Sequence, residues 1–313
     1  MDAMSQLLSG LSAHGAFVLR CSLRSPWAMR IEDEAPISVV APVRGHAHIC
    51  PDGADPVLLN AGDVAVVRGP RHYRVADEVD SVPQVLIRPG QVCIDLAGRD
   101  TPPMSEVGVR TWGNAADGDT LLLDGTYESQ TSVGHRLLRN LPELVVAPRE
   151  HVPGALVDYL GVQMALDEPG QEAVLDRLLD LVLVAVLRWW FAEQAGDGAN
   201  WYRAHADPVV GRALGLMQGD PAAPWTVASL AARSGLSRAA FARRFTELVG
   251  EPPMTFLTTW RLTVAADLLT EPGMTVSAVA RRVGYSTPFA FSTAFKRLHE
   301  VSPQHYRDRQ GIA

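Results

Sequence analysis

Two stretches near the carboxyl end of the chain decide its fold. The first runs Thr226-Val-Ala-Ser-Leu-Ala-Ala-Arg-Ser-Gly235, and the second runs Thr275-Val-Ser-Ala-Val-Ala-Arg-Arg-Val-Gly284. Each begins with a threonine whose hydroxyl can accept from the unpaired N–H groups of a first helical turn. Each ends with a glycine, which tolerates positive φ in a tight turn. The repeat therefore predicts the same helix and glycine turn twice.

A second helix is expected after each turn. Ser237 can cap the first of these helices, and Ser286 or Thr287 can cap the second. Each helix carries two phenylalanines at i and i+4, which share a face and can dock on a core. The pairs are Phe241 with Phe245, and Phe291 with Phe295. This pattern predicts a double helix-turn-helix; a repeat used for packing alone would not need arginines gathered on the outer face.

The charge distribution agrees with a DNA-binding domain at the carboxyl end. The whole chain has a net charge of −7, which by itself argues against a nucleic-acid partner. Residues 208–313 contain 12 basic and 7 acidic side chains, whereas residues 1–207 contain 16 basic and 28 acidic ones. A basic segment on an acidic chain is expected when one domain faces phosphate.

Other classes of protein find little support. The chain starts without the pattern of a signal peptide, and its most apolar run, Leu178–Leu187, is too short to span a bilayer. We therefore expect a cytoplasmic protein without a membrane partner. Cys21, Cys50 and Cys93 follow no metal-ligand spacing. No nucleophile and base set, phosphate-binding glycine loop or His-Glu-x-x-His motif is visible, so we expect neither an enzyme nor a cofactor.

The amino-terminal part has the pattern of a β-structure followed by helices. Short alternating runs separated by turn residues favour an antiparallel sandwich or barrel such as a jelly roll. The predicted strands are Phe17–Leu23, Ile37–Val43, His46–Cys50, Val57–Leu59, Asp63–Val67, Val85–Ile87 and Thr120–Tyr127.

The period of the apolar residues changes from Pro142 onward. Ala155–Leu166 and Gln171–Gln194 are predicted helices, and Ala195–Pro208 is a predicted linker. Glu172–Gln194 is apolar on nearly every side, which favours burial against the barrel on one side and against a second copy of the chain on the other. The predicted fold class is thus α+β in two domains. Residues 1–150 form a cupin-like sensing domain, 151–200 a helical dimerisation hairpin, and 201–313 an all-α double helix-turn-helix.

The last hundred residues resemble the AraC/XylS family of transcription regulators. The matching positions are Ser237–Phe245, Gly250–Pro253, Arg261-Leu262, Gly284-Tyr285, Phe295–Arg297, Ser302-Pro303 and Tyr306-Arg307. The resemblance implies that a linker helix, about Pro253–Leu269, holds two recognition helices roughly one DNA turn apart.

The resemblance also implies which residues contact DNA. In the first recognition helix, Ala239, Ala242 and Arg243 would meet base edges, and Arg243 could bind guanine in a bidentate manner worth about 1–3 kcal/mol. The second helix would present Pro288, Phe289, Ser292 and Thr293. Because the family often has an arginine at the position of Thr293, we expect this helix to contact mainly phosphates. The predicted phosphate contacts are Ser237, Arg238, Arg244, Thr287, Lys296 and Arg297.

The amino-terminal segment is similar to the cupin-type sensor domain of one AraC subgroup. The matching stretches are Ser25-Pro26-Trp27, Gly45-His-Ala-His48, Ala61-Gly62-Asp63, Pro70-Arg-His72 and Glu168–Asp180.

Three histidines are the candidate effector-binding residues of this domain. His46 and His48 alternate on one predicted strand face, and His72 could join them. They could bind an organic effector, bind a metal, or have plain structural roles; because no glutamate follows where metal cupins place one, no metal is assigned. Cys21 would be redox-sensitive if Arg20 or Arg24 lowered its pKa.

The sequence predicts a sequence-specific, DNA-binding transcription regulator controlled by a small-molecule or stress signal. The expected partners are double-stranded promoter DNA, an unidentified effector, and a second copy bound through Glu172–Gln194; RNA polymerase is a further candidate. The alternative function is a metal-dependent cupin enzyme fused to a DNA-binding module. A regulator that acts constitutively, without an effector, is a third hypothesis. Activation and repression both stay open.

Overall fold

The computed structural model describes residues 16–98, 103–127, 131–138, 141–193 and 201–309. These residues form two units, each described separately below. The first comprises the described parts of residues 12–130 and 141–191, and the second those of residues 131–140 and 192–313. None of the helices in the described residues is long and apolar enough to cross a membrane.

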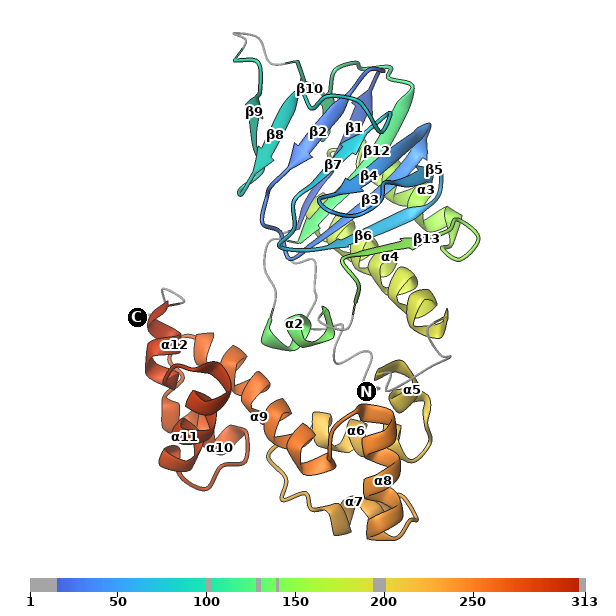
Figure 1. Cartoon of the computed structure of the whole chain (residues 1–313). Coiled ribbons are helices and arrows are strands. Elements are labelled where there is room, and N and C mark those ends of the chain that lie inside the picture. Colours follow the sequence, from blue (N-terminus) through green and yellow to red (C-terminus); the bar gives the residue numbers. More distant parts are fainter. Residues whose placement is uncertain (1–15, 99–102, 128–130, 139–140, 194–200, 310–313) are drawn as a thin grey trace. The chain divides into compact units, whose positions relative to one another are not determined.

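The first unit contains two sheets (Figure 1). The seven-stranded sheet has the order β10 (Ser105–Gly108), β11 (Thr111–Gly113), β1 (Phe17–Leu23), β12 (Thr120–Tyr127), β3 (Ile37–Arg44), β6 (Val64–Arg68) and β13 (Leu144–Ala147). The six-stranded sheet has the order β5 (Val57–Asn60), β4 (His46–Pro51), β7 (Tyr73–Ala76), β2 (Ala28–Ile31), β8 (Val85–Arg88) and β9 (Val92–Asp95). This arrangement confirms the predicted cupin-like β-domain.

Two helices cover the outer face of the seven-stranded sheet. They are α3 (Gly154–Gln163) and α4 (Gln171–Glu193). A Cβ atom at Gly125 of β12 would lie 2.4 Å from Leu179 Cδ1, so the glycine lets α4 approach the strand closely. Helix α4 buries Leu175, Leu183 and other side chains on this side. The contact with the barrel that was predicted for this helix is therefore present. Residue 194, which ends the predicted helix, lies outside the described residues.

Alternation along the central strands separates the two faces of the seven-stranded sheet. On β12, Leu123 and Gly125 lie beside α3 and α4, whereas Leu122 and Asp124 face the six-stranded sheet. Successive side chains of a strand point to opposite faces, so one strand contributes both to the helix contact and to the space between the sheets.

The second unit is helical. It comprises α2 (Ser132–Leu138), α5 (Trp201–Ala206), α6 (Val210–Gly219), α7 (Val227–Arg233), α8 (Arg238–Val249), α9 (Pro253–Thr270), α10 (Val276–Arg282), α11 (Pro288–His299) and α12 (Pro303–Arg309). The two predicted helix-turn-helix motifs are α7 with α8 and α10 with α11, joined by α9. The all-α carboxyl-terminal domain is thus confirmed.

Local sequence signals explain the ends of these helices. Thr226 accepts from the Ser229 N–H at 3.1 Å, and Thr275 accepts from the Ala278 N–H at 3.1 Å. Gly235 and Gly284 have φ values of +70° and +82°, in the left-handed region that disfavours side chains with a Cβ. Both turns therefore form by the mechanism that the repeat indicates.

The structure differs from the predicted organisation in three places. Residues 141–191 group with the strands, so the hairpin of α3 and α4 is part of the sensor unit. Residues 131–138 lie between two strands in the sequence yet belong to the helical unit. The predicted linker Ala195–Pro208 contains helix α5, while its residues 195–200 lie outside the described part of the chain.

Candidate DNA-binding surface and effector cavity

Helix α8 presents the predicted first recognition surface. Its cap, Ser237, accepts from the Ala240 N–H at 3.3 Å. Phe241 and Phe245 are fully buried, with ring centroids 5.7 Å apart, and this fixes the rotation of the helix. The opposite face is consequently open to solvent: Arg238, Ala239 and Arg243 are exposed, and Ala242 is half-buried.

Two arginines of α8 have different surroundings. The Arg243 side chain is 78% exposed, and its Nε lies 3.8 Å from Glu247 Oε1, a contact loose enough to be exchanged for a ligand. Arg244 instead binds Asp207, with Nη2 to Oδ2 at 2.5 Å and Nε to Oδ2 at 3.1 Å. The Asp207 side chain is only 10% exposed, and the guanidinium helps hold the pKa of this carboxyl below its usual range. Arg244 thus ties α8 to the residues between α5 and α6, while its phosphate contact stays a prediction.

Helix α11 has the same construction in the second motif. Thr287 caps it by accepting from the Ala290 N–H at 3.2 Å, and Phe291 and Phe295 are fully buried. Phe289 is 83% exposed, a large apolar side chain without cover on the free protein. The Thr293 hydroxyl donates to the Phe289 carbonyl oxygen at 3.0 Å, so it is already engaged within its own helix.

The other predicted DNA contacts of α11 lie on its accessible surface. Pro288, Lys296 and Arg297 are exposed, and Ser292 is half-buried. The helix therefore offers cations and hydroxyls without an exposed arginine at the position of Thr293, which agrees with a role in phosphate contacts.

Three polar side chains, to none of which the sequence assigned a structural role, fix the framework of this unit. Arg261 of α9 donates to the carbonyl oxygens of Pro221 at 2.7 Å and Ala223 at 2.9 Å. Arg307 of α12 donates to the Leu269 carbonyl oxygen at 3.1 Å. The third is Asp267 of α9, whose carboxylate accepts from Ser132 N at 2.6 Å and Val133 N at 3.3 Å and so caps α2. The partners lie 33 or more residues away in sequence, so no local pattern could reveal them.

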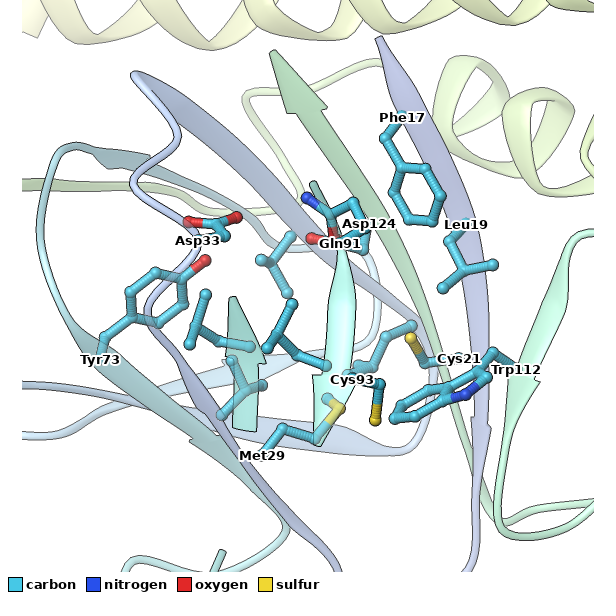
Figure 2. A pocket seen from close by; sticks show the side chains of 15 residues that line it. Phe17, Leu19, Cys21, Met29, Asp33, Tyr73, Gln91, Cys93, Trp112 and Asp124 are labelled. Atoms are coloured by element: carbon cyan, nitrogen blue, oxygen red, sulfur yellow. The ribbon is translucent and has the colours of Figure 1, made fainter. Parts of the chain in front are cut away.

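The sensor unit contains a cavity between its two sheets. Figure 2 shows the side chains that line it, and its volume is about 120 Å³. Most of the lining is apolar or aromatic, including Phe17, Trp112 and Met29. Cys93 of strand β9 lines the cavity and is also exposed, so the cavity opens to solvent along this strand.

Two carboxyl groups interrupt the apolar lining. Asp124 lies on the central strand β12, and burial, with the nearby charge of Asp33 as a second cause, raises its pKa to about 7. Burial also raises the pKa of Asp33, which accepts from the Ala35 N–H at 3.1 Å. The Tyr73 hydroxyl has a pKa raised well above its usual range by burial and by both carboxyls. Tyr73 therefore stays protonated at neutral pH.

The histidines predicted to bind an effector do not line this cavity. Ala47 and Ile49 are fully buried, and the period of two turns His46 and His48 to the other face of β4. His48 Nδ1 donates to the Asp77 carbonyl oxygen at 2.9 Å. His72 lies beyond the other end of this strand, where its Nε2 donates to Glu34 Oε1 at 2.8 Å.

The positions of the three histidines also argue against the hypothesis that they bind a metal together. His48 pairs with Ala76 and Pro51 pairs with Tyr73, which puts His72 about 13 Å along the strand from His48. Among the described residues, no group of three or more His, Cys, Asp or Glu side chains could hold a metal ion. The alternative function of a metal-dependent enzyme is not favoured.

The hypothesis that an arginine acidifies Cys21 is wrong. Burial and the Asp124 carboxyl raise the pKa of the Cys21 thiol. Arg20 lies on the opposite face of β1, and its Nη2 donates to Thr111 Oγ1 at 2.8 Å. The Cys21 sulfur is therefore a neutral thiol at physiological pH.

Comparison with known proteins matches both units. A family model described as a cupin covers residues 2–192, and a helix-turn-helix domain model covers residues 230–309. An AraC-like transcription regulator of Streptomyces lividans is 30% identical over 98% of both chains. The chain belongs to this family of AraC-like transcription regulators. A second AraC-like relative, the HTH-type transcriptional regulator AlkR of Acinetobacter baylyi, is 25% identical over 99% of this chain and 100% of its own.

One solved structure that is similar to the carboxyl-terminal part of the chain is a DNA complex. The DNA-binding domain of the global transcriptional factor AdpA, in complex with a target DNA, is 34% identical and covers 33% of this chain and 92% of that one, with a TM-score of 0.32. The two family models and the full-length AraC-like relatives show that this chain is a DNA-binding transcription regulator with a cupin-type amino-terminal domain.

Proposed function

We propose that this AraC-like regulator binds promoter DNA through α8 and α11 under the control of a small molecule bound in its sensor unit. The observation that carries the effector part is the cavity between the sheets, because an opening into an apolar space with a few polar groups is the usual form of a small-molecule site. The family relationship supports the DNA part. We favour effector control over a constitutive regulator, and we propose a cytoplasmic protein that acts with promoter DNA and RNA polymerase.

The DNA contacts that we propose differ between the two recognition helices. Arg243 supplies base recognition from α8, since it is exposed and only weakly engaged. Lys296 and Arg297 of α11 supply phosphate contacts, and Phe289 offers an apolar surface to a thymine methyl group.

Binding to a DNA site selected from a random library by the full chain tests the DNA contacts. The logarithm of the affinity should fall linearly with the logarithm of the salt concentration, with a slope of about −0.9 per neutralised phosphate. Arg243→Ala should weaken specific binding by about 1–3 kcal/mol and lose preference at one base pair. Arg88→Ala removes one exposed charge from the sensor unit and serves as the matched control. Salt-independent binding, or an unchanged base preference in Arg243→Ala, would contradict these contacts.

Chain connectivity supports a route from the cavity to the DNA-binding unit. Strand β12 carries Asp124 into the cavity and ends at Tyr127, and α2 begins five residues later at Ser132. Helix α2 in turn is capped by Asp267 of α9, the helix that connects the two helix-turn-helix motifs. We propose that effector binding shifts the docking equilibrium of α2 on α9, and thereby the arrangement of the two motifs available to DNA.

The outer surface of α3 and α4 supports the proposal of a dimer. After α4 has packed on the sheet, apolar side chains remain exposed on both helices: Tyr159 is 51% exposed, Val162 58% and Leu181 53%. Large apolar side chains that stay exposed on a helical surface are typical of a subunit interface. The occupant that we propose is the same surface of a second copy, because a twofold dimer buries one patch against itself.

A further inference from the structure

The charge pattern of the cavity indicates the chemistry of its ligand, and this inference rests on the effector site proposed above. Both charged side chains that line it, Asp33 and Asp124, are acidic; none of the described lining residues is Lys, Arg or His. A carboxylate in an apolar space without a cation destabilises the folded state. Two acidic side chains at such a site do not favour folding, so they are candidates for binding a ligand.

The polar groups gather at one end of the cavity. In Figure 2, Asp33, Gln91, Asp124 and the Tyr73 hydroxyl lie in the upper part of the view, while Met29, Cys93, Cys21 and Trp112 lie in the lower part. The influence of Asp33 on the pKa of Asp124, and of both carboxyls on the pKa of Tyr73, agrees with this proximity. A ligand that fills the space therefore meets an anionic end and an apolar end.

The volume limits the size of the ligand. The cavity of about 120 Å³ is comparable with the engineered apolar cavity of ~150 Å³ that accommodates benzene. The walls include three aromatic side chains, Phe17, Tyr73 and Trp112, which suit a flat ring or a compact alkyl group and can also face a cation.

We propose that the cavity binds a small organic cation, an amine whose apolar body is about the size of a single benzene ring, with its ammonium group facing Asp124 and Asp33. The ammonium group supplies the positive charge that the lining lacks, and it donates hydrogen bonds to the carboxylates. An anionic ligand of the same shape is repelled by both acids. A neutral one gains the apolar contacts without the ion pair.

The amine should bind more tightly as the pH rises from 6 to 8. The other titratable groups that line the cavity with Asp124 are Asp33, Tyr73, Cys21 and Cys93. Burial raises the pKa of Tyr73 and of both thiols, so these three groups stay neutral over this range. The carboxyl of Asp124, with a pKa of about 7, loses its proton within the range and then attracts the ammonium group.

Calorimetric titration of the full chain with four molecules of nearly equal shape tests the proposal. The probes are benzylamine, benzyl alcohol, toluene and benzoate, at pH 8 and pH 6. We expect benzylamine to bind at least about tenfold more tightly than the other three at pH 8, and to lose most of this advantage at pH 6. Asp124→Asn should reduce benzylamine affinity at least about tenfold while leaving toluene unaffected. Asp55→Asn, which removes an exposed carboxyl on the same unit, is the matched control.

The outcomes separate this inference from the proposed function. Equal or tighter binding of toluene or benzyl alcohol would overturn the cation assignment while leaving an effector cavity in place. Failure of all four probes to bind would overturn the inference and indicate that the two acids share a proton without a ligand. DNA affinity of the same preparation, measured with and without benzylamine, reports separately on DNA binding and on its control by the cavity.

Discussion

At the scale of single residues, the acid of strand β12 illustrates how a functional group costs stability. Asp124 sits on a central strand where its alternation partner Leu122 is a core residue, so an apolar side chain would suit the position. Its pKa of about 7, against 3.8 for an unperturbed aspartate, means that the folded protein retains a proton which the unfolded chain loses. The contribution of Asp124 to the stability of the protein should therefore fall as the pH rises from about 4 to 7 and level off above 7.

Asp124→Asn should remove this pH dependence. At pH 8 the variant should exceed the original chain in free energy of unfolding by a few kcal/mol, and the difference should shrink toward pH 4, since a neutral amide avoids the burial of charge. Urea unfolding of the full chain between pH 4 and pH 8 measures it, with Asp55→Asn as the control. A difference that is constant over this range would show that Asp124 does not titrate as inferred.

At the scale of elements, helix α2 contacts the helical unit, although in the sequence it lies between two strands of the sensor unit. The seven-residue helix is too short to be stable alone. Its first N–H groups are satisfied by a side chain of α9, 134 or more residues away in the chain. A short helix held by a few contacts opens locally at low free-energy cost, which suits an element that transmits a signal.

Asp267→Ala should detach α2 without unfolding the double helix-turn-helix. Loss of a capping carboxylate costs about 1–2 kcal/mol, so amide exchange of residues 132–138 should accelerate roughly 5- to 30-fold. Hydrogen exchange followed by mass spectrometry measures this, and Glu271→Ala, beyond the end of α9, is the control. If α2 couples the cavity to the DNA, the same variant should retain DNA binding but lose its response to the effector. Unchanged exchange in α2 would exclude the cap as its main restraint.

At the scale of the whole molecule, the exposed surface of α3 and α4 predicts self-association. Leu181→Glu places a charge within the proposed dimer contact and should raise the dimer dissociation constant at least about tenfold. Sedimentation velocity of the full chain over a range of concentrations measures it. Leu58→Glu, at a comparably exposed leucine of the opposite sheet (46% against 53%), is the matched control. A monomeric original chain, or equal weakening by both variants, would contradict this interface.

The sequence by itself determined the helical DNA-binding unit, because its signals act over short distances. Threonine and serine caps, glycines with positive φ and phenylalanines at i and i+4 operate within one or two turns, so Thr226, Gly235 and Phe241 predict their own surroundings. The same holds for alternating strands such as Phe17–Leu23, which the structure reproduces with its predicted bounds. Shorter strands such as Ala28–Ile31 were not predicted, because four residues show too little alternation to indicate a strand.

Only the tertiary structure decided where the candidate effector site lies. Asp33 and Asp124 are far apart in sequence and line one cavity because the two sheets pack face to face. The tertiary structure likewise decided that His46 and His48 face away from the core, since the orientation of their strand depends on the pairing of β4 with β7. The pairs Asp207 with Arg244 and Asp267 with Ser132 have the same origin. Contacts that close long loops depend on how whole elements pack, and no local pattern of residues encodes that packing by itself.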